Sequence, residues 1–105
     1  MNTLAQDIAR RAHALDQGGL SAALEPLGIS DWTRTVQDLD FQGWDTGGGC
    51  MMLVADLPGT AGYQVGITDG DAGVPRDPET FWLGLLDPDG EELYFLFVAG
   101  GELQI

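Results

Sequence analysis

The feature that most constrains the fold is a pair of six-residue apolar segments joined by a short turn sequence. Residues 81–86 and 93–98 contain only apolar or aromatic side chains and one glycine, and Asp87-Pro88-Asp89-Gly90 lies between them. Proline presets the backbone angle that a turn requires, aspartate hydrogen-bonds nearby amides, and glycine accepts a positive φ. The pattern therefore predicts a β-hairpin over residues 81–98.

Further strands are predicted upstream and downstream of this hairpin. Turn residues bound the segments 33–41, 50–55 and 63–68, and Gly43 together with residues 45–49 predicts a turn between the first two. A long loop is expected over 69–79, and Leu103 and Ile105 add a short final strand. Several of these strands are apolar at consecutive positions, so both faces of the sheet require burial.

The N-terminal part has the periodicity of helices. Residues 4–17 carry one apolar stripe at spacings of three and four, which predicts a helix that ends at Gly18-Gly19. Ser21 is placed to cap a short second helix that stops near Pro26 and Gly28. We therefore expect one α+β domain over 1–105, with a helical part over 1–28 and a β part over 32–105. Its N-terminal helices pack on an antiparallel sheet of about five strands.

The net charge excludes several classes of function. Seventeen acidic residues face four basic ones, which gives a formal charge of −13. Such a protein repels nucleic acid and anionic membranes, so we expect neither as a direct ligand. The N-terminal segment contains Asp7, Arg10 and Arg11, unlike a secretory signal. Cys50 is the single cysteine, which fits a reducing cytoplasm, in a bacterial or phage-infected cell.

Motifs for catalysis or for metal binding are weak. Cys50 and His13 could form a nucleophile–base pair, but Cys50 opens an apolar segment and no signature of a thiol enzyme surrounds it. The glycines at 47–49 lack the lysine of a phosphate-binding loop. The acidic pairs lack the spacing of a calcium-binding EF-hand loop. We expect no enzyme activity, no cofactor and no metal site.

The acidic residues themselves are the strongest candidates for a binding site. Residues 1–52 carry a net charge of −4 and residues 53–105 carry −9. Most of the charge in the second half lies in segments expected to form loops, which are free to face a partner. The predicted acidic contact set is Asp69, Asp71, Asp77, Glu79, Asp87, Asp89, Glu91 and Glu92.

A second candidate surface is an apolar sheet face that the two predicted helices cannot cover. Either the sheet closes into a barrel, or this face meets a partner or a second copy of the chain in a homodimer. The residues assigned to this face are Trp82, Leu86, Tyr94, Leu96 and Val98.

Together these features favour a small acidic, non-enzymatic protein that binds a basic partner. Carboxylates on a rigid sheet imitate phosphates and could inhibit or mask a nucleic-acid-binding protein, as phage anti-defence and anti-CRISPR inhibitors do. A bacterial immunity protein or a secretion chaperone is an alternative with the same size and charge. A further alternative is an accessory domain whose acidity serves only solubility or salt adaptation.

Overall fold

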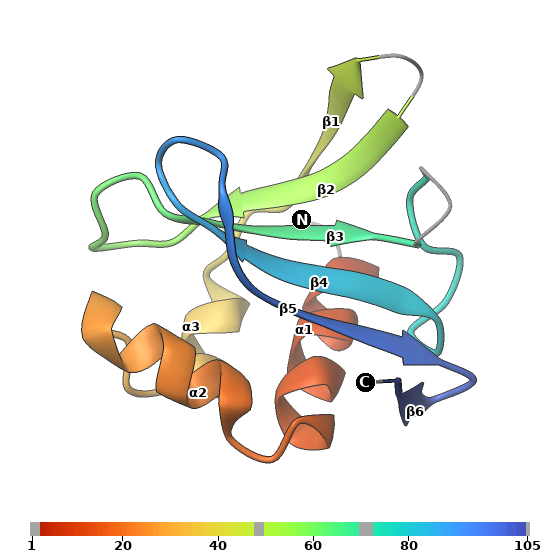
Figure 1. Ribbon diagram of the computed structural model, residues 1–105, viewed down its shortest axis with the longest axis horizontal. Coiled ribbons are helices and arrows are strands. Elements are labelled where there is room, and N and C mark those ends of the chain that lie inside the picture. The colour runs from red at the N-terminus through yellow and green to blue at the C-terminus, as the bar shows by residue number, and fades with distance from the viewer. Residues whose placement is uncertain (1–2, 48–49, 70–72, 105) are drawn as a thin grey trace.

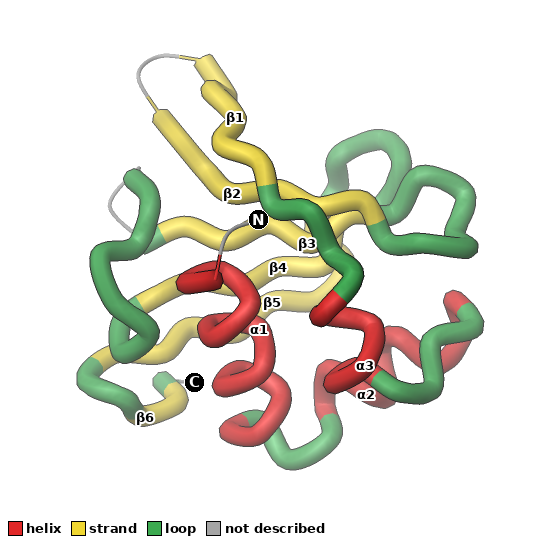
Figure 2. The backbone as a smooth tube through the Cα atoms, turned by 180° about the vertical axis from the view of Figure 1, so that it is seen from behind, coloured by secondary structure: helices red, strands yellow, loops and turns green. Residues whose placement is uncertain are grey.

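The protein consists of two layers, a β-sheet and a group of helices on one of its faces (Figure 1). The computed structural model describes residues 3–47, 50–69 and 73–104. Figure 2, viewed from behind, shows the N-terminal helix in front of the strands, whereas the strands lie in front of this helix in Figure 1. The structure confirms the α+β class, with helices packed against an antiparallel sheet.

The sheet is an antiparallel meander in which each strand pairs with the next along the chain. β1 and β6 are therefore its two edges, and the sheet is open over the described residues. The alternative of a closed barrel is wrong. The six strands are β1 (Gln42–Gly47), β2 (Cys50–Asp56), β3 (Gln64–Thr68), β4 (Phe81–Leu86), β5 (Glu92–Ala99) and β6 (Glu102–Leu103).

The predicted hairpin of β4 and β5 is confirmed. The Gly90 amide donates to the Asp87 carbonyl at 2.9 Å, and Gly90 has a φ of 85°. This is the left-handed conformation that glycine adopts without strain. The Asp87 side chain also accepts hydrogen bonds from the Asp89 and Glu91 amides, at 2.9 and 2.8 Å. Turn chemistry alone therefore explains this part of the fold.

The helical layer is larger than the sequence pattern indicated. It contains α1 (Thr3–Leu15), α2 (Gly19–Leu24), a 3₁₀ turn (Glu25–Leu27) and α3 (Trp32–Gln37). The long helix α1 packs against α2, α3 and β4. Its Gln6 side chain is buried and donates to the backbone carbonyls of Gln37 and Leu39, at 3.3 and 3.4 Å.

The strand predicted over 33–41 is wrong, because residues 32–37 form α3. The Asp31 side chain accepts a hydrogen bond from the Arg34 amide at 3.2 Å and so caps the first turn of the helix. Trp32 and Val36, four residues apart, are both buried, and the Trp32 indole donates to the Ala9 carbonyl at 3.0 Å. The helical part therefore extends beyond residue 28, to 37.

The turn predicted at Gly43 and residues 45–49 is wrong over residues 43–47. Residues 42–47 form the edge strand β1, in which Gly43 pairs with Leu53 and Trp44 with Met52. Residues 48 and 49 lie outside the described residues. At the C-terminus Leu103 belongs to β6, as predicted, and Ile105 is outside the described part.

The core lies between the helices and one face of the sheet. Side chains from the four long inner strands meet the buried faces of α1, α2 and α3 there. The buried sheet residues on this inner face are Leu53, Ala55, Val65, Ile67, Phe81, Leu83, Leu85, Leu96 and Val98.

The linker between α1 and α2 is tied to β5 by a carboxylate. Asp16 Oδ2 accepts a hydrogen bond from the Tyr94 hydroxyl at 2.5 Å and from the Leu20 amide at 2.6 Å. Gly19 lies directly beneath the Tyr94 hydroxyl, and a Cβ atom at this position would overlap it. The position therefore requires glycine for close packing.

We expect Gly19→Ala to lower the free energy of unfolding by about 1–3 kcal/mol, because the added methyl displaces Tyr94 from Asp16. Urea unfolding monitored by circular dichroism measures this change. The double variant Gly19→Ala/Tyr94→Phe removes the overlapping oxygen, so Gly19→Ala should cost less in that background. An equal cost in both backgrounds would contradict the explanation.

Candidate functional site

The candidate site is the sheet face that points away from the helices, called the outer face below. No described helix covers it (Figures 1 and 2). Residues that pair directly across antiparallel strands point to the same face, so the strand register assigns its members. The outer face carries the large side chains of Trp44, Met52, Val54, Trp82, Leu86, Phe95 and Phe97.

The predicted apolar surface mixed the two faces of β5. Trp82 and Leu86 lie on the outer face, but Trp82 pairs with Phe97, and Leu83 pairs with Leu96. The residues that join Trp82 are therefore Phe95 and Phe97. Tyr94, Leu96 and Val98 point to the inner face, where Leu96 and Val98 are buried and Tyr94 is partly buried. Residues 93–98 are apolar throughout, so the sequence carried no signal for the correct face.

Three aromatic rings form a stack on the outer face. The Trp82 ring lies 5.1 Å from the Phe95 ring and 4.9 Å from the Phe97 ring, with interplanar angles of 30° and 23°. Each such pair contributes about 0.5–1.5 kcal/mol beyond the burial of its area, so the rings hold one another in place. Phe95 nevertheless remains 51% exposed. The stack presents a rigid aromatic surface to solvent.

The middle of the outer face has no side chains of its own at two paired positions, because both are glycines. Gly66 of β3 lies opposite Gly84 of β4. The Met52 methyl group lies over Gly66, and the Glu92 carboxylate lies 2.8 Å from the point where a Cβ of Gly84 would be. Flexible side chains, not fixed ones, therefore fill the centre of this face.

Glu92 places a carboxylate against this apolar centre. Burial raises the pKa of the Glu92 carboxyl above its ordinary value of 4.5, because the partly covered carboxylate is poorly hydrated. The fold therefore favours the neutral carboxyl. That preference stabilises the protein at pH values below the ordinary pKa, and the stabilisation is lost as the pH rises through the raised pKa.

We expect Glu92→Gln to raise the free energy of unfolding slightly at about pH 7, where the ionised carboxylate is unfavourable. The gain should shrink as the pH falls to about 4, where Glu92 is itself largely neutral. Urea unfolding of both proteins at these two pH values measures the difference. A gain of equal size at both would show that packing, not charge, distinguishes glutamine from glutamate here.

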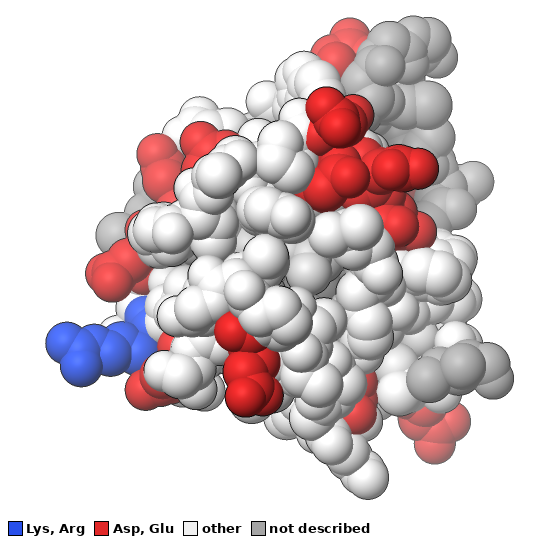
Figure 3. Space-filling model, turned by 60° about the vertical axis from the view of Figure 1, so that its left-hand side comes forward, with Lys and Arg blue, Asp and Glu red and all other residues white. Residues whose placement is uncertain are grey.

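The predicted acidic residues divide between the two ends of the sheet. Asp87, Asp89, Glu91 and Glu92 lie at the end where β4 turns into β5, called the turn end below. Asp56 joins them from the last position of β2, in a row with Gln64, Leu86 and Glu92 across the strands. Figure 3, in which this end comes forward, shows groups of acidic side chains there, with basic ones only at one margin.

The remaining predicted acids lie between β3 and β4, roughly 17 Å away along β4 at about 3.4 Å per residue. Asp69 accepts a hydrogen bond from the Gly73 amide at 3.0 Å, and Asp77 accepts one from the Glu79 amide at 2.9 Å. Asp71 lies outside the described residues. The eight predicted residues are therefore not one cluster, and several of their carboxylates stabilise loop backbone.

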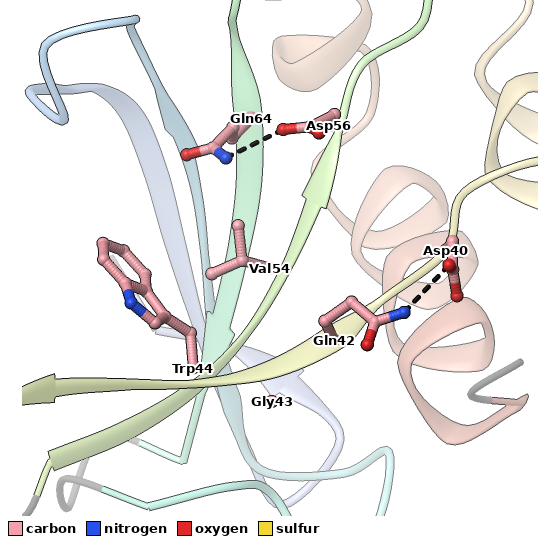
Figure 4. A pocket seen from close by; sticks show the side chains of 7 residues that line it. All are labelled: Asp40, Gln42, Gly43, Trp44, Val54, Asp56 and Gln64. Atoms are coloured by element: carbon pink, nitrogen blue, oxygen red, sulfur yellow. Dashed lines mark hydrogen bonds between the residues drawn. The ribbon is translucent and has the colours of Figure 1, made fainter.

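A pocket of about 340 Å³ opens on the outer face beside β1, near the turn end. The Trp44 ring stands on one side, and two carboxylate–amide pairs stand on the other (Figure 4). Gln42 Nε2 donates to Asp40 at 2.8 Å, and Gln64 Nε2 donates to Asp56 at 2.8 Å. The residues that line the pocket are Asp40, Gln42, Gly43, Trp44, Val54, Asp56 and Gln64.

Sequence reasoning missed this pocket. Its signal was the alternate spacing of Asp40, Gln42 and Trp44, which places all three on one face of an extended strand. That signal was lost because residues 33–41 were assigned to a strand and Gly43 to a turn.

Of the nucleophile–base pair considered from the sequence, the Cys50 side chain lies outside the described part of the chain and the His13 side chain lies within it. His13 Nε2 lies 2.6 Å from Ser21 Oγ, which ties α1 to α2, and no described carboxylate hydrogen-bonds to the imidazole. No group of three potential metal ligands occurs among the described residues. The longest described helix has 13 residues, and none in the described part has the length and apolar character of a membrane span.

No family model, no curated protein and no solved structure matches this chain. The geometry of the outer face is therefore the basis for the functional interpretation.

Proposed function

We propose that the protein binds a basic, nucleic-acid-binding protein through its outer face and thereby inhibits or masks it. The observation that carries this proposal is an uncovered aromatic surface bordered by carboxylates. Half of Phe95 and of Trp44 is exposed, at 51% and 53%. Exposed aromatic groups of this kind form the centres of protein interfaces, and polar groups form their rims.

The negative net charge of the chain favours a basic partner over a second copy of the chain. A second copy would bring another −13 to the same surface, and its turn end would repel the first. A partner with arginine and lysine around an apolar centre has the complementary arrangement. Dense basic surfaces of this kind are typical of proteins that bind nucleic acid. The carboxylates of the turn end would occupy the places of phosphates and block that surface.

The described residues of the outer face favour a role in binding, because no described nucleophile, base or metal-ligand group there is arranged for a reaction. Its titratable groups are carboxylates whose described partners are amides, as in the Asp40–Gln42 and Asp56–Gln64 pairs. These acceptors suit the recognition of cationic groups.

Affinity capture from a nuclease-treated bacterial lysate tests the proposal. The immobilised protein should retain a basic protein, and duplex DNA or an increase from about 0.15 M to about 1 M salt should release it. Phe95→Ala, which leaves the charge unchanged, should reduce the retained amount by at least about tenfold. Val74→Ala is the matched control, because Val74 is also an exposed apolar residue but lies in the β3–β4 loop.

Equal retention by wild type and Phe95→Ala would contradict docking on the outer face. Retention of a partner that duplex DNA does not displace would contradict the phosphate-mimic role. Sedimentation at micromolar concentration that showed a stable dimer through Phe95 would assign the face to a second copy instead.

A further inference from the structure

The pocket beside Trp44 has the chemistry of a cation site. Each glutamine donates its amide N–H to the neighbouring carboxylate, which fixes the side chain and turns its carbonyl oxygen away. In Figure 4 the Gln64 nitrogen faces Asp56 and the oxygen points to the opposite side. The second oxygen of each carboxylate and the amide oxygens therefore remain as acceptors, and no described group donates a hydrogen bond to them.

No described cation neutralises the pocket. Neither Asp40 nor Asp56 forms an ion pair with a described residue, and Gln42 and Gln64 are neutral partners. The two carboxylate–amide pairs and Trp44, which is 53% exposed, lie on different sides of the pocket, and the Val54 side chain lies between them (Figure 4). A long cationic side chain that lies across the pocket would contact the indole and bring its charge toward the carboxylates.

The shape of the site favours a guanidinium over an ammonium group. A guanidinium is planar and weakly hydrated, so it stacks on an indole face while its edge keeps five N–H donors. Those donors spread in a fork that can reach carboxylates on more than one strand. An ammonium is a compact, strongly hydrated charge, so its contact with an exposed aromatic ring contributes less binding free energy. The volume of about 340 Å³ accommodates the end of a long side chain.

We propose that this pocket receives the side chain of an arginine on the basic partner, which lies along Trp44 and Val54 with its guanidinium group directed toward the carboxylates of Asp40 and Asp56. This inference rests on the proposed function and names the group that its outer face recognises. The other end of the face, the aromatic stack around Trp82, then contacts apolar side chains of the same partner.

N-acetyl-arginine amide is the probe that tests the pocket without the partner. The indole N–H signals of the three tryptophans report the position of binding by NMR, since Trp32 lies in the core and Trp82 in the aromatic stack. The probe should move the Trp44 signal, with a dissociation constant on the order of millimolar. The Trp32 signal should stay in place. N-acetyl-lysine amide should bind at least about fivefold more weakly. N-acetyl-citrulline amide, which has the same shape without the charge, should cause no shift.

A pair of charge-matched variants provides the control. Asp40→Asn/Asp56→Asn keeps the Trp44 reporter and should weaken the arginine probe by at least about tenfold. Glu25→Gln/Glu102→Gln removes the same charge at exposed positions on other elements and should leave binding unchanged. Equal binding of the lysine or citrulline probe, or unchanged affinity in the asparagine variant, would overturn the proposal.

The proposed function and the proposed arginine pocket are tested by different experiments, and each can be contradicted without the other. If the arginine probe does not move Trp44, the pocket assignment is wrong, and the capture experiment with Phe95→Ala still stands. If the probe binds as expected but no basic protein is captured, the proposed function is wrong although the pocket takes a guanidinium group.

Discussion

Leu96→Ala is expected to lower the free energy of unfolding by about 2–5 kcal/mol, whereas Phe95→Ala should lower it by only about 1 kcal/mol. These neighbours in β5 point to opposite faces of the sheet. Leu96 is 2% exposed and pairs with Leu83 in the core, so its loss leaves a cavity. Phe95 is half exposed and loses mainly its stack with Trp82.

Urea unfolding of the two alanine variants measures this difference. Because the stability of a domain is usually about 5–15 kcal/mol, Leu96→Ala could leave too little folded protein for the measurement. Leu96→Val then provides a smaller deletion, with an expected loss of about 1 kcal/mol. A larger loss for Phe95→Ala than for Leu96→Ala would mean that β5 presents its other face to the helices.

Reversal of charge at the turn end is expected to slow association with the captured basic partner by about tenfold or more at about 0.15 M salt. The variant is Asp89→Lys/Glu91→Lys, because both side chains are exposed and neither hydrogen-bonds to a described residue. Asp87 is left unchanged, since its carboxylate accepts the backbone N–H groups that form the turn. The melting temperature should therefore change little.

Stopped-flow association at several salt concentrations measures this effect. The dependence of the association rate on salt should be flatter in the variant, because fewer charges steer the encounter. Glu79→Lys/Glu102→Lys makes the same change in net charge at exposed positions at the opposite end of the sheet and should slow association by less than about threefold. Equal effects of the two variants would show that net charge, and not the turn end, directs the partner.

The parts of the fold that could be predicted are those in which local chemistry acts alone. Asp87-Pro88-Asp89-Gly90 specifies a turn whatever surrounds it, so the β4–β5 hairpin was predicted correctly. The apolar stripe of α1 repeats over three turns, which distinguishes a helix from a strand. These signals required no knowledge of distant contacts.

The parts that were missed depend on contacts far apart in the sequence. α3 has only six residues, so the periodicity was too short to outweigh the β-branched side chains of Thr33, Thr35 and Val36. Its stability comes from the Asp31 cap and from Trp32, which reaches Ala9 on α1. Tertiary packing thus decided the structure of this segment.

The candidate site was predicted only in part, for the same reason. Acidic character and an uncovered apolar face could be read from composition and from the consecutive apolar strands. The face that each residue of β5 joins could not, because only its register with β4 and the irregularity at Leu85 and Leu86 fix it. Prediction of the pocket would have required the correct bounds of β1 and the register in which β1 pairs with β2.

The most direct test of the outer face as the contact surface uses the three indole N–H signals during a titration with protamine, an arginine-rich protein. At about 0.15 M salt the charges on distant loops are screened beyond about 8 Å, so specific contacts dominate the shifts. The account predicts that the Trp44 and Trp82 signals move together, while the Trp32 signal, held by Ala9 on the opposite side of the sheet, does not. Shifts confined to loop amides between β3 and β4, with Trp44 and Trp82 unmoved, would contradict it.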